Sequence, residues 1–445
     1  MNFCGYAPAR MKSDGPHSGI LRKCPSNREK GGMLSVEDWL KAKEADDGAE
    51  GLWRVHDGIY DFTSFVKTHP GGKYWLEVTK GTDITEAFES HHISEKAENM
   101  LKKFWVKKAT TPRMSTLTFH EDGFYKTLKR KVRKAKPVPF TGSTWESRML
   151  IDGLLVCFLL TNYLGIYNYW WSILSGVFLY MVAVAAHNFF HMKDNLRMYY
   201  FNLSLLSFRE WRISHSLSHH QYVNTLLDLE ISLLEPIFDY LPKKDKNLLV
   251  RFLSWAYSPI VFCGVFHYEF FIKKILKLVF RQKTHFHWEE FLAFTVPLLT
   301  WLVSNEDPLK VFAAWNVTIV SGSFFFFLIG LTAAHHHPEI YHEGDYIGDD
   351  KDFGLFQLAA VRDREEVNGN YFLTMISFGE HALHHMFPTL DHRKLPALNP
   401  YLEETCKEFN VDYKLKTYAN LVSGMYRQLA RNYVNGRVYS KKLKH

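Results

Sequence analysis

Apolar residues are unevenly distributed along the chain, with a polar first third followed by long hydrophobic segments. Residues 149–169 and residues 170–190 each approach the roughly 20 residues that a helix needs to cross a bilayer. Because the two segments are nearly contiguous, they predict a tight helical hairpin. A second pair is predicted at about residues 291–304, together with the preceding turn, and at residues 310–334. The pattern therefore predicts an all-α membrane domain with four transmembrane helices.

The polar first third of the chain is predicted to contain three parts. Residues 1–34 have no apolar segment of the kind found in cleaved signal peptides and are predicted to form a disordered tail. Residues 35–110 predict a small soluble domain, and residues 111–147 predict a basic linker. The membrane domain is expected to extend from residue 148 to about residue 435.

Charged residues predict how the chain is oriented in the membrane. The net charge of +7 is modest, but lysine and arginine are frequent in residues 191–288 and near both ends of the chain. The connector "NEDP" between the third and fourth predicted helices carries acidic residues and no basic one. Because cytoplasmic loops are enriched in lysine and arginine, both termini and residues 191–288 are predicted to lie in the cytosol, and both hairpin tips in the lumen.

Two basic segments are predicted to contact lipid. The run "LKRKVRKAK" at residues 128–136 lies just ahead of the first apolar segment, a position that favours an anionic lipid surface over nucleic acid as its partner. The amphipathic segment "FFIKKILKLVF" at residues 270–280 is expected to lie at the membrane interface. Basic side chains in and after it either attract an acyl-CoA phosphate or lipid headgroup, or simply extend from an interfacial helix. They are Lys273, Lys274, Lys277, Arg281 and Lys283.

A first candidate site lies in the predicted soluble domain. His69 occurs in an H-P-G-G motif, and His91 and His92 follow some two dozen residues later. Two histidines carried by separate loops can bind one haem from opposite faces, which leaves no open iron position and is typical of electron carriers. Gly71 and Gly72 permit a tight turn beside the ring. The alternative is an ordinary small domain with a surface H-P-G-G turn.

The surrounding sequence is more specific than this motif. The segments "YDFTSF" and "GTDITEAF", together with the H-P-G-G motif, resemble the cytochrome b5 family over nearly the whole predicted domain. The resemblance implies an α+β fold, bound haem b and the axial ligands His69 and His92, with His91 as the alternate for His92. Four acidic residues are expected to make the haem flank negative and to steer a basic redox partner. They are Glu77, Asp83, Glu86 and Glu89.

Three histidine clusters form a second candidate site. "HNFFH", "HSLSHH" and "HALHH" place histidines three or four residues apart, and residues at i and i+4 share one face of a helix. The predicted topology brings all three clusters, and the segment "TAAHHHPEIYH", to the cytosolic face of the membrane. Several converging imidazoles predict two or more transition-metal ions. The clustered histidines are His187 and His191, then His215, His219 and His220, and finally His381, His384 and His385.

Iron fits these clusters better than zinc does. Too many histidines converge for one tetrahedral zinc site, and the five cysteines are scattered with no C-x-x-C pair. A single H-x-x-x-H pair is more often structural, but three such clusters at one predicted boundary favour a metal site. A one-electron haem carrier earlier in the same chain favours iron that activates oxygen.

The clusters resemble the histidine boxes of membrane fatty acid desaturases, and the haem domain resembles that of front-end and sphingolipid desaturases. The segments "DFGLFQL" and "HHMFPTLDHRKLPALNPYLEETCKE" extend the resemblance to about residues 50–430. It implies four transmembrane helices under a cytosolic helical cap, and two non-haem iron ions held by the clustered histidines. His335 in "TAAH" is the best further ligand, with His336 as the alternate. The resemblance implies no catalytic residue beyond the metal ligands.

Two departures from the family pattern concern the clusters themselves. The third cluster begins with His381, where front-end desaturases usually have glutamine. Three residues separate His215 from His219, where those enzymes usually have two. A third departure is Leu331, because acyl-CoA desaturases carry an asparagine one turn before the additional histidine. These departures leave the reaction outcome open.

The resemblance implies an enzyme of lipid metabolism in the endoplasmic reticulum membrane. The primary interpretation is an O2-dependent desaturase that receives electrons from an NADH-cytochrome b5 reductase-type donor. Its substrate would be an acyl-CoA or a lipid-linked acyl chain, into which it would introduce a double bond. The alternatives are a lipid hydroxylase with the same centre and a membrane-anchored haem electron carrier with a degenerate desaturase body. No nucleic acid partner is expected.

Overall fold

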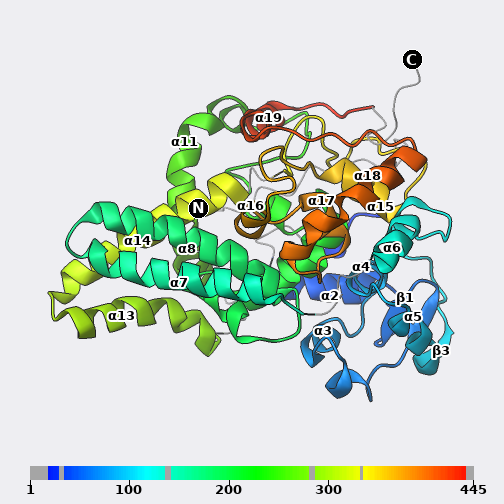
Figure 1. Cartoon of the computed structure of the whole chain (residues 1–445). Coiled ribbons are helices and arrows are strands. Elements are labelled where there is room, and N and C mark those ends of the chain that lie inside the picture. Colours follow the sequence, from blue (N-terminus) through cyan, green and yellow to red (C-terminus); the bar gives the residue numbers. More distant parts are fainter. Residues whose placement is uncertain (1–18, 30–34, 136–141, 280–285, 331–333, 437–445) are drawn as a thin grey trace.

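The computed structural model describes residues 19–29, 35–135, 142–279, 286–330 and 334–436. Within these residues, a small α+β domain is followed by a larger helical domain (Figure 1). The predicted order of an α+β domain and an all-α domain with four long apolar helices is confirmed.

A three-stranded antiparallel sheet forms the base of the first domain. The strands of the sheet are β1 (Trp53–Val55), β2 (Gly58–Tyr60) and β3 (Trp105–Lys108). The helices of this domain are α2 (Val36–Asp46), α3 (Lys73–Val78), α4 (Thr85–His91) and α5 (Glu95–Leu101). The strands lie in the order β1-β2-β3, and Trp53 pairs with Tyr60 across the β1–β2 hairpin. Trp53, Phe62 and Leu76 form a small hydrophobic core. This core supports the loops that carry the predicted haem ligands.

Part of the predicted tail is ordered. Ile20 is fully buried, and the short helix α1 (Ser26–Glu29) follows it. Arg28 donates hydrogen bonds to backbone carbonyl oxygens of the larger domain. Residues 19–29 therefore correct the prediction of a disordered tail, because their partners lie far along the chain and are not visible in the local sequence. The rest of that tail lies outside the described residues.

The predicted linker contains a helix that is integrated into the fold. Helix α6 (Phe124–Lys134) is amphipathic, and Tyr125 and Leu128 on its apolar face are fully buried. It packs against α15 (Phe353–Ala360) and α18 (Asn399–Glu408) of the larger domain. Helix α6 therefore joins the two domains structurally, and the description as a basic linker is corrected.

The acidic residues near the predicted haem ligands are buried against α6. Asp83, Glu86 and Glu89 are at most 3% exposed. Glu89 forms ion pairs at 2.9 Å with both Lys126 and Lys129. Asp83, Glu86 and Glu89 therefore do not face an external partner, and Lys129 at the start of the basic run does not lie on lipid. Each prediction is wrong for the same reason, since the sequence does not reveal that the two oppositely charged segments meet.

A second ion-pair network connects the two domains. Arg113 pairs with Asp83 at 2.7 Å and also with Glu86. From the larger domain, Tyr222 Oη donates a hydrogen bond to Glu86 at 3.1 Å. Of the four acidic residues predicted to form the haem flank, Glu77 is the one whose side chain stays 46% exposed. The first domain is thus held against the second by buried charges.

Long apolar helices form three of the four membrane spans predicted from the sequence. They are α7 (Trp145–Gly165), α8 (Tyr169–Phe190) and α14 (Pro308–Gly330). Thr144 caps the start of α7 and Asn168 caps the start of α8, directly after the hairpin turn. A Cβ on Gly176 of α8 would lie 2.6 Å from the backbone nitrogen of Gly322 in α14. Small residues at this contact permit the close helix packing that stabilises membrane bundles.

The remaining predicted span is corrected. Residues 291–304 form α13 (Leu292–Ser304), whose 13 residues are fewer than a full crossing needs. A fourth stretch that is long and apolar enough occurs at Leu248–Val279. It contains α11 (Leu248–His267) and α12 (Lys273–Val279). This stretch was not predicted as a span because the surrounding segment is rich in basic residues. Within α11 itself, the one charged residue is Arg251.

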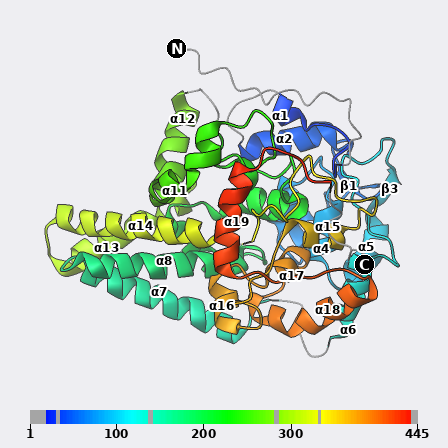
Figure 2. The same ribbon diagram turned by 90° about the horizontal axis from the view of Figure 1, so that it is seen from above.

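Helices α7, α8, α13 and α14 lie side by side in both views, and α11 runs across their direction (Figures 1 and 2). The α7–α8 and α13–α14 hairpin tips lie at one end of this bundle. Short helices form a cap at the other end, next to the α+β domain. Besides α15 and α18, the cap contains α9 (Phe208–Trp211), a π-helix η4 (Arg212–His219), α10 (His220–Tyr222), α16 (Tyr371–Ile376), α17 (His381–Met386) and α19 (Tyr418–Ala430).

Candidate haem site and metal centre

Two of the three candidate haem ligands face each other. The rings of His69 and His92 lie 6.1 Å apart, and Phe65 and Phe88 pack against them. His69 Nδ1–H donates to the Gly72 carbonyl oxygen at 2.8 Å, and His92 Nδ1–H donates to the Phe88 carbonyl oxygen at 2.9 Å. These bonds fix the tautomer of both rings, so each Nε2 is available to an axial metal.

The two glycines of the H-P-G-G motif are required by the shape of this loop. Gly72 has a φ of +100°, in the region that favours glycine. A Cβ on Gly71 would lie 2.9 Å from His69 Cε1. Any larger residue at position 71 would therefore displace the His69 ring.

His91, the alternate ligand, points in another direction. Its ring packs against Trp75 at 5.8 Å, and its Nδ1–H donates to the Ala87 carbonyl oxygen at 2.8 Å. Its Nε2 is buried and has no hydrogen-bond partner among the described residues. The end of α4 thus turns two adjacent histidines to different sides, and His92 is the one that faces His69.

The fold brings all nine predicted metal-binding histidines into one buried region, where none is more than 6% exposed. They come from four parts of the chain. His187 and His191 lie at the end of α8, His215 and His219 in η4, His220 at the start of α10, His335 after α14, and His381, His384 and His385 in α17.

The second histidine cluster adopts a π-helix, which a simple i, i+4 pattern does not predict. The backbone N–H of His220 donates to the carbonyl oxygen of His215, five residues earlier. His215 and His220 therefore share a face, with their Nε2 atoms 2.9 Å apart, whereas His219 faces other partners. π-Helical turns are rare and occur frequently at functional sites. This wider turn accommodates the additional residue between His215 and His219.

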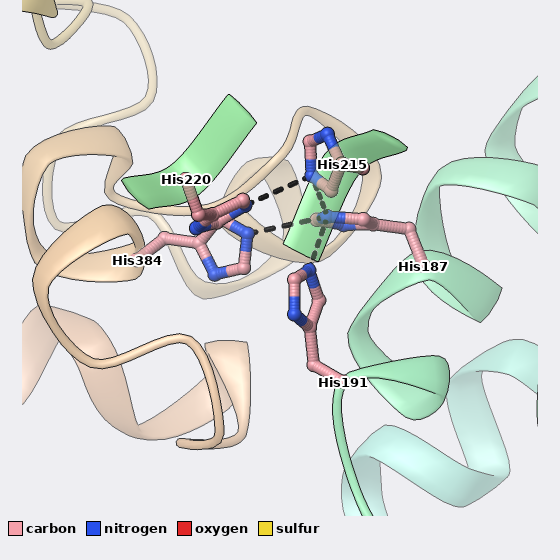
Figure 3. A group of neighbouring side chains, drawn as sticks. All are labelled: His187, His191, His215, His220 and His384. Atoms are coloured by element: carbon pink, nitrogen blue, oxygen red, sulfur yellow. Dashed lines mark hydrogen bonds between the residues drawn. The ribbon is translucent and has the colours of Figure 1, made fainter. Parts of the chain in front are cut away.

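Five of the histidines form one group, which we call the five-histidine group. Its members are His187, His191, His215, His220 and His384 (Figure 3). His187 Nε2 lies 2.6 Å from His215 Nε2, 2.9 Å from His191 Nε2 and 3.2 Å from His384 Nε2. A ring nitrogen carries at most one hydrogen, so these contacts cannot all be hydrogen bonds. They fit ligands of one metal ion, since bonds of about 2.1 Å place neighbouring nitrogens about 3 Å apart.

The other four histidines form a second group, which we call the four-histidine group. His219, His335 and His385 present possible ligand atoms within 4.8 Å of one another, and His381 Nε2 lies 2.5 Å from His335 Nε2. His385 Nε2 is buried without a hydrogen-bond partner among the described residues. This nitrogen is therefore free to bind a metal ion together with the neighbouring imidazoles. The His220 and His385 rings stack at 4.2 Å, so the two groups are adjacent.

Two carboxylates orient the imidazoles of the second cluster. His215 Nδ1–H donates to Glu230 at 2.7 Å, and His219 Nδ1–H donates to Asp228 at 3.0 Å. Such outer partners direct the opposite nitrogen toward a metal and strengthen it as a ligand. Sequence reasoning missed both residues, although acidic residues soon after a histidine cluster are the signal that could have identified them.

Three further polar residues contact the histidines from outside. Gln357 Oε1 accepts a hydrogen bond from His385 Nδ1 at 3.2 Å. Ser216 Oγ lies 3.1 Å from His191 Nδ1, and His392 Nε2 lies 3.2 Å from His384 Nδ1. None of the three stands out in the sequence, because each depends on the folding of distant segments onto the clusters.

The environment keeps most of these imidazoles neutral, as metal ligands must be. Burial and neighbouring imidazoles hold the pKa of His335, His384 and His385 well below its ordinary value. His219 differs from them. Burial lowers its pKa, but Glu230 and Asp228 outweigh burial and raise the pKa to about 9. The two carboxylates therefore favour positive charge at this side of the centre.

The three consecutive histidines after α14 have separate surroundings. His335 enters the four-histidine group. His336, the alternate ligand, stacks on Tyr240 with the ring centroids 3.5 Å apart. His337 accepts a hydrogen bond from Arg427 at 3.0 Å. The structure thus brings His335 to the cluster and leaves His336 outside it.

The lysines of α12 do not form a free phosphate-binding surface. Lys273 pairs with Glu210 at 2.9 Å and with Glu269 at 2.7 Å, and Lys274 pairs with Glu290. Lys277, which belongs to the same predicted set, is 4% exposed. The predicted attraction of a phosphate or headgroup is therefore wrong for these lysines, because internal carboxylates neutralise them. Arg281 and Lys283 lie outside the described residues.

Comparisons with known proteins agree with this architecture. Residues 164–417 match the family described as fatty acid desaturase, and residues 37–109 match the cytochrome b5-like haem/steroid binding domain. The chain belongs to the fatty acid desaturase family, as a member with an N-terminal cytochrome b5-like domain. It is 42% identical to the cytochrome b5-related protein of Drosophila melanogaster over 423 residues, which cover 93% of this chain and 95% of that protein.

More distant relatives match this chain over most of their length. The chain is 25% identical to Delta(5) fatty acid desaturase A of Dictyostelium discoideum, over 82% of this chain and 86% of that protein. It is 21% identical to the acyl-lipid (8-3)-desaturase of Mortierella alpina, over 81% of this chain and 89% of that protein. The predicted family resemblance is confirmed. The b5 domain implies a haem, the buried histidines are consistent with a di-metal site, and the apolar helices indicate a multi-pass membrane protein.

Proposed function

We propose that the chain is an O2-dependent membrane lipid desaturase, in which a fused cytochrome b5 haem supplies electrons to a histidine-held di-iron centre. The observation that carries this proposal is the convergence of nine buried histidines in two adjacent groups. Imidazole nitrogens packed at such distances are costly unless they share metal ions. The names of the Dictyostelium and Mortierella relatives support desaturation as the reaction class.

His69 and His92 are the proposed axial ligands of haem b. Both rings donate Nδ1–H to backbone carbonyl oxygens, which leaves Nε2 of each ring for the iron. Two histidine ligands leave no open position, and this coordination suits one-electron transfer. The proposed electron source is an NADH-cytochrome b5 reductase-type donor.

The five-histidine group is proposed to hold one iron ion and the four-histidine group the other. Two iron ions there would use O2 to supply the oxidising power that removes hydrogens from two adjacent acyl carbons. Glu230 and Asp228 keep His215 and His219 in the tautomer that directs Nε2 inward. Burial of the whole region excludes water, which protects such a reaction from side products.

The proposed location is the endoplasmic reticulum membrane, with both termini and the cap in the cytosol. The separation between hairpin tips and cap supports this orientation, since both histidine groups lie at the cap end of the bundle (Figure 1). In this arrangement α7, α8 and α14 cross the bilayer, and the tips of the α7–α8 and α13–α14 hairpins face the lumen. The proposed substrate is an acyl-CoA or a lipid-linked acyl chain.

The third cluster supports an enzyme over an electron carrier with a degenerate body. His381 stands where front-end desaturases usually have glutamine, and its Nε2 lies 2.5 Å from His335 Nε2. The departure therefore adds an imidazole to the four-histidine group and removes none. All nine imidazoles are therefore present to hold two iron ions.

Product analysis distinguishes desaturation from hydroxylation. Full-length protein in lipid nanodiscs, supplied with NADH, reductase, O2 and a mixture of acyl-CoA and phospholipid, is expected to yield lipids that have lost two hydrogens. The measurement is mass spectrometry of the extracted acyl chains, with the same reaction under nitrogen as the control. A product that has gained one oxygen atom would contradict desaturation and support a hydroxylase.

A further inference from the structure

A buried chain of hydrogen bonds connects the haem domain with the five-histidine group. Ser90 Oγ donates to Gln221 Oε1 at 3.2 Å, and Gln221 Nε2 donates to the carbonyl oxygen of Ser216 at 3.0 Å. Ser216 Oγ in turn lies 3.1 Å from His191 Nδ1. Ser90, Gln221, Ser216 and His191 are each at most 1% exposed. No water is needed to complete this connection.

Both ends of this hydrogen-bonded connection lie at the proposed redox centres. Ser90 is two residues before His92 on the same stretch of backbone, and His191 belongs to the five-histidine group. Gln221 directly follows the second histidine cluster and crosses the contact between the domains. Its amide orientation is determined, because the Ser216 carbonyl oxygen can only accept a hydrogen bond. Gln221 Oε1 is thereby left to accept from Ser90.

The domain contact is suited to a permanent connection of this kind. The ion pairs of Glu89 with Lys126 and Lys129 are buried beside it. The hydrophobic core that contains Tyr125 and Leu217 extends across the same contact. The haem domain is therefore held in one orientation, and the path from its haem-ligand loop to the metal centre has a defined length.

We propose that Ser90, Gln221 and Ser216 form the electron route from the haem to the metal centre. In each transfer one electron leaves the haem iron and one electron arrives at the metal centre, and no bond is made or broken along the route. The residues act as positioning residues that replace through-space gaps by short hydrogen bonds. This inference rests on the proposed function, because it requires both redox centres to be loaded.

A contact between Arg212 and Trp75 offers a rival connection. The Arg212 guanidinium carbon lies 5.0 Å from the Trp75 ring centroid, and Arg212 Nε donates to the Phe190 carbonyl oxygen. This connection contains a longer gap at the ring and ends on a backbone oxygen. The chain through Gln221 ends on an imidazole nitrogen of the metal group, so we favour it.

The test is flash photoreduction of the haem in the full-length, iron-loaded protein without oxygen, followed by absorbance. In the wild-type protein the reduced haem is expected to reoxidise as its electron passes to the metal centre. Ser90→Ala and Gln221→Leu are expected to slow this decay several-fold. Their haem spectrum, haem potential and iron content should match wild type, and reoxidation by added ferricyanide should be unchanged.

Thr389→Val is the matched control variant. Thr389 Oγ1 donates to the His91 carbonyl oxygen at 3.1 Å, so this change also removes one hydrogen bond between the domains, beside Ser90 but off the route. Its decay rate is expected to equal that of the wild type. Equal slowing in Thr389→Val would indicate loosened docking and would overturn the route.

The remaining outcomes also decide between the proposals. Wild-type decay rates in both Ser90→Ala and Gln221→Leu would overturn the route while leaving the proposed function intact. If the wild-type haem stays reduced, the proposed transfer between the two centres fails, and the function proposal fails with it. Because Ser90 lies in the haem domain, its variant tests the route even if Gln221→Leu fails to fold.

Discussion

Replacing His384 by alanine is expected to abolish lipid oxidation while the b5 absorption spectrum stays intact. His384 Nε2 lies 3.2 Å from His187 Nε2, and the His384 ring connects the five-histidine group with His392. The substitution removes one ligand from the iron ion proposed for the five-histidine group and leaves that coordination position empty. The haem ligands lie in another domain, so an unchanged haem spectrum shows that the haem domain stays folded. His219→Ala should act in the same way through the four-histidine group.

The control for His384→Ala is a substitution of a buried histidine that lies outside both groups, and His336 is such a residue. His336→Phe keeps an aromatic ring stacked on Tyr240 and removes the imidazole nitrogens. We expect His336→Phe to retain activity and His384→Ala to show none above background, both measured as product per haem. Unchanged product in His384→Ala would contradict the assignment of this residue. Loss of activity in His336→Phe with full iron content would show that the site is larger than the two groups.

Replacing Glu89 by alanine is expected to destabilise the haem domain by about 3 kcal/mol, because removal of one partner leaves buried charge uncompensated. Lys129 is fully buried and Lys126 is 7% exposed, and both pair with this carboxylate. Burial raises the pKa of Glu89, but the hydrogen bond with His56 and the two lysines outweigh it, so the pKa is well below the ordinary range. The carboxylate therefore stabilises the fold at neutral pH, and this contribution is lost only in strong acid.

The measurement is the denaturant midpoint for loss of haem absorption in detergent-solubilised protein. Glu77→Ala is the control, since Glu77 is an exposed acidic residue of the same domain and its pair with Lys73 contributes at most about 1 kcal/mol. Equal midpoints for the Glu89 and Glu77 variants would show that the buried ion pairs of Glu89 do not stabilise the haem domain.

The sequence was sufficient to predict which histidines converge in the fold. All nine histidines chosen from three clusters and one "TAAH" segment meet in one buried region. Local spacing was a weaker guide to which of them are neighbours. It pairs His215 with His219, whereas the π-helix turns His215 toward His220 and His219 toward His335. The outer partners Asp228 and Glu230 were missed, because their contacts with His219 and His215 depend on how the chain returns to the second cluster.

Charge patterns were misleading for a different reason. They show where charged residues occur but not which segments meet in the fold. Lys129 and Glu89 lie 40 residues apart and neutralise each other in the domain contact. Likewise, Lys273 and Glu210 pair across 63 residues, so the amphipathic helix has no free row of lysines. The apolar helix α11 was missed because it lies inside a segment that is basic overall.

The most direct test of the proposed di-iron centre is the ratio of total iron to haem in detergent-purified, full-length protein. Elemental analysis and haem quantification on the same sample are expected to give about three irons per haem, with little zinc. His384→Ala should lower this ratio without changing the haem content. A ratio of about one, after expression with ample iron, would contradict the di-iron centre and favour a membrane-anchored electron carrier.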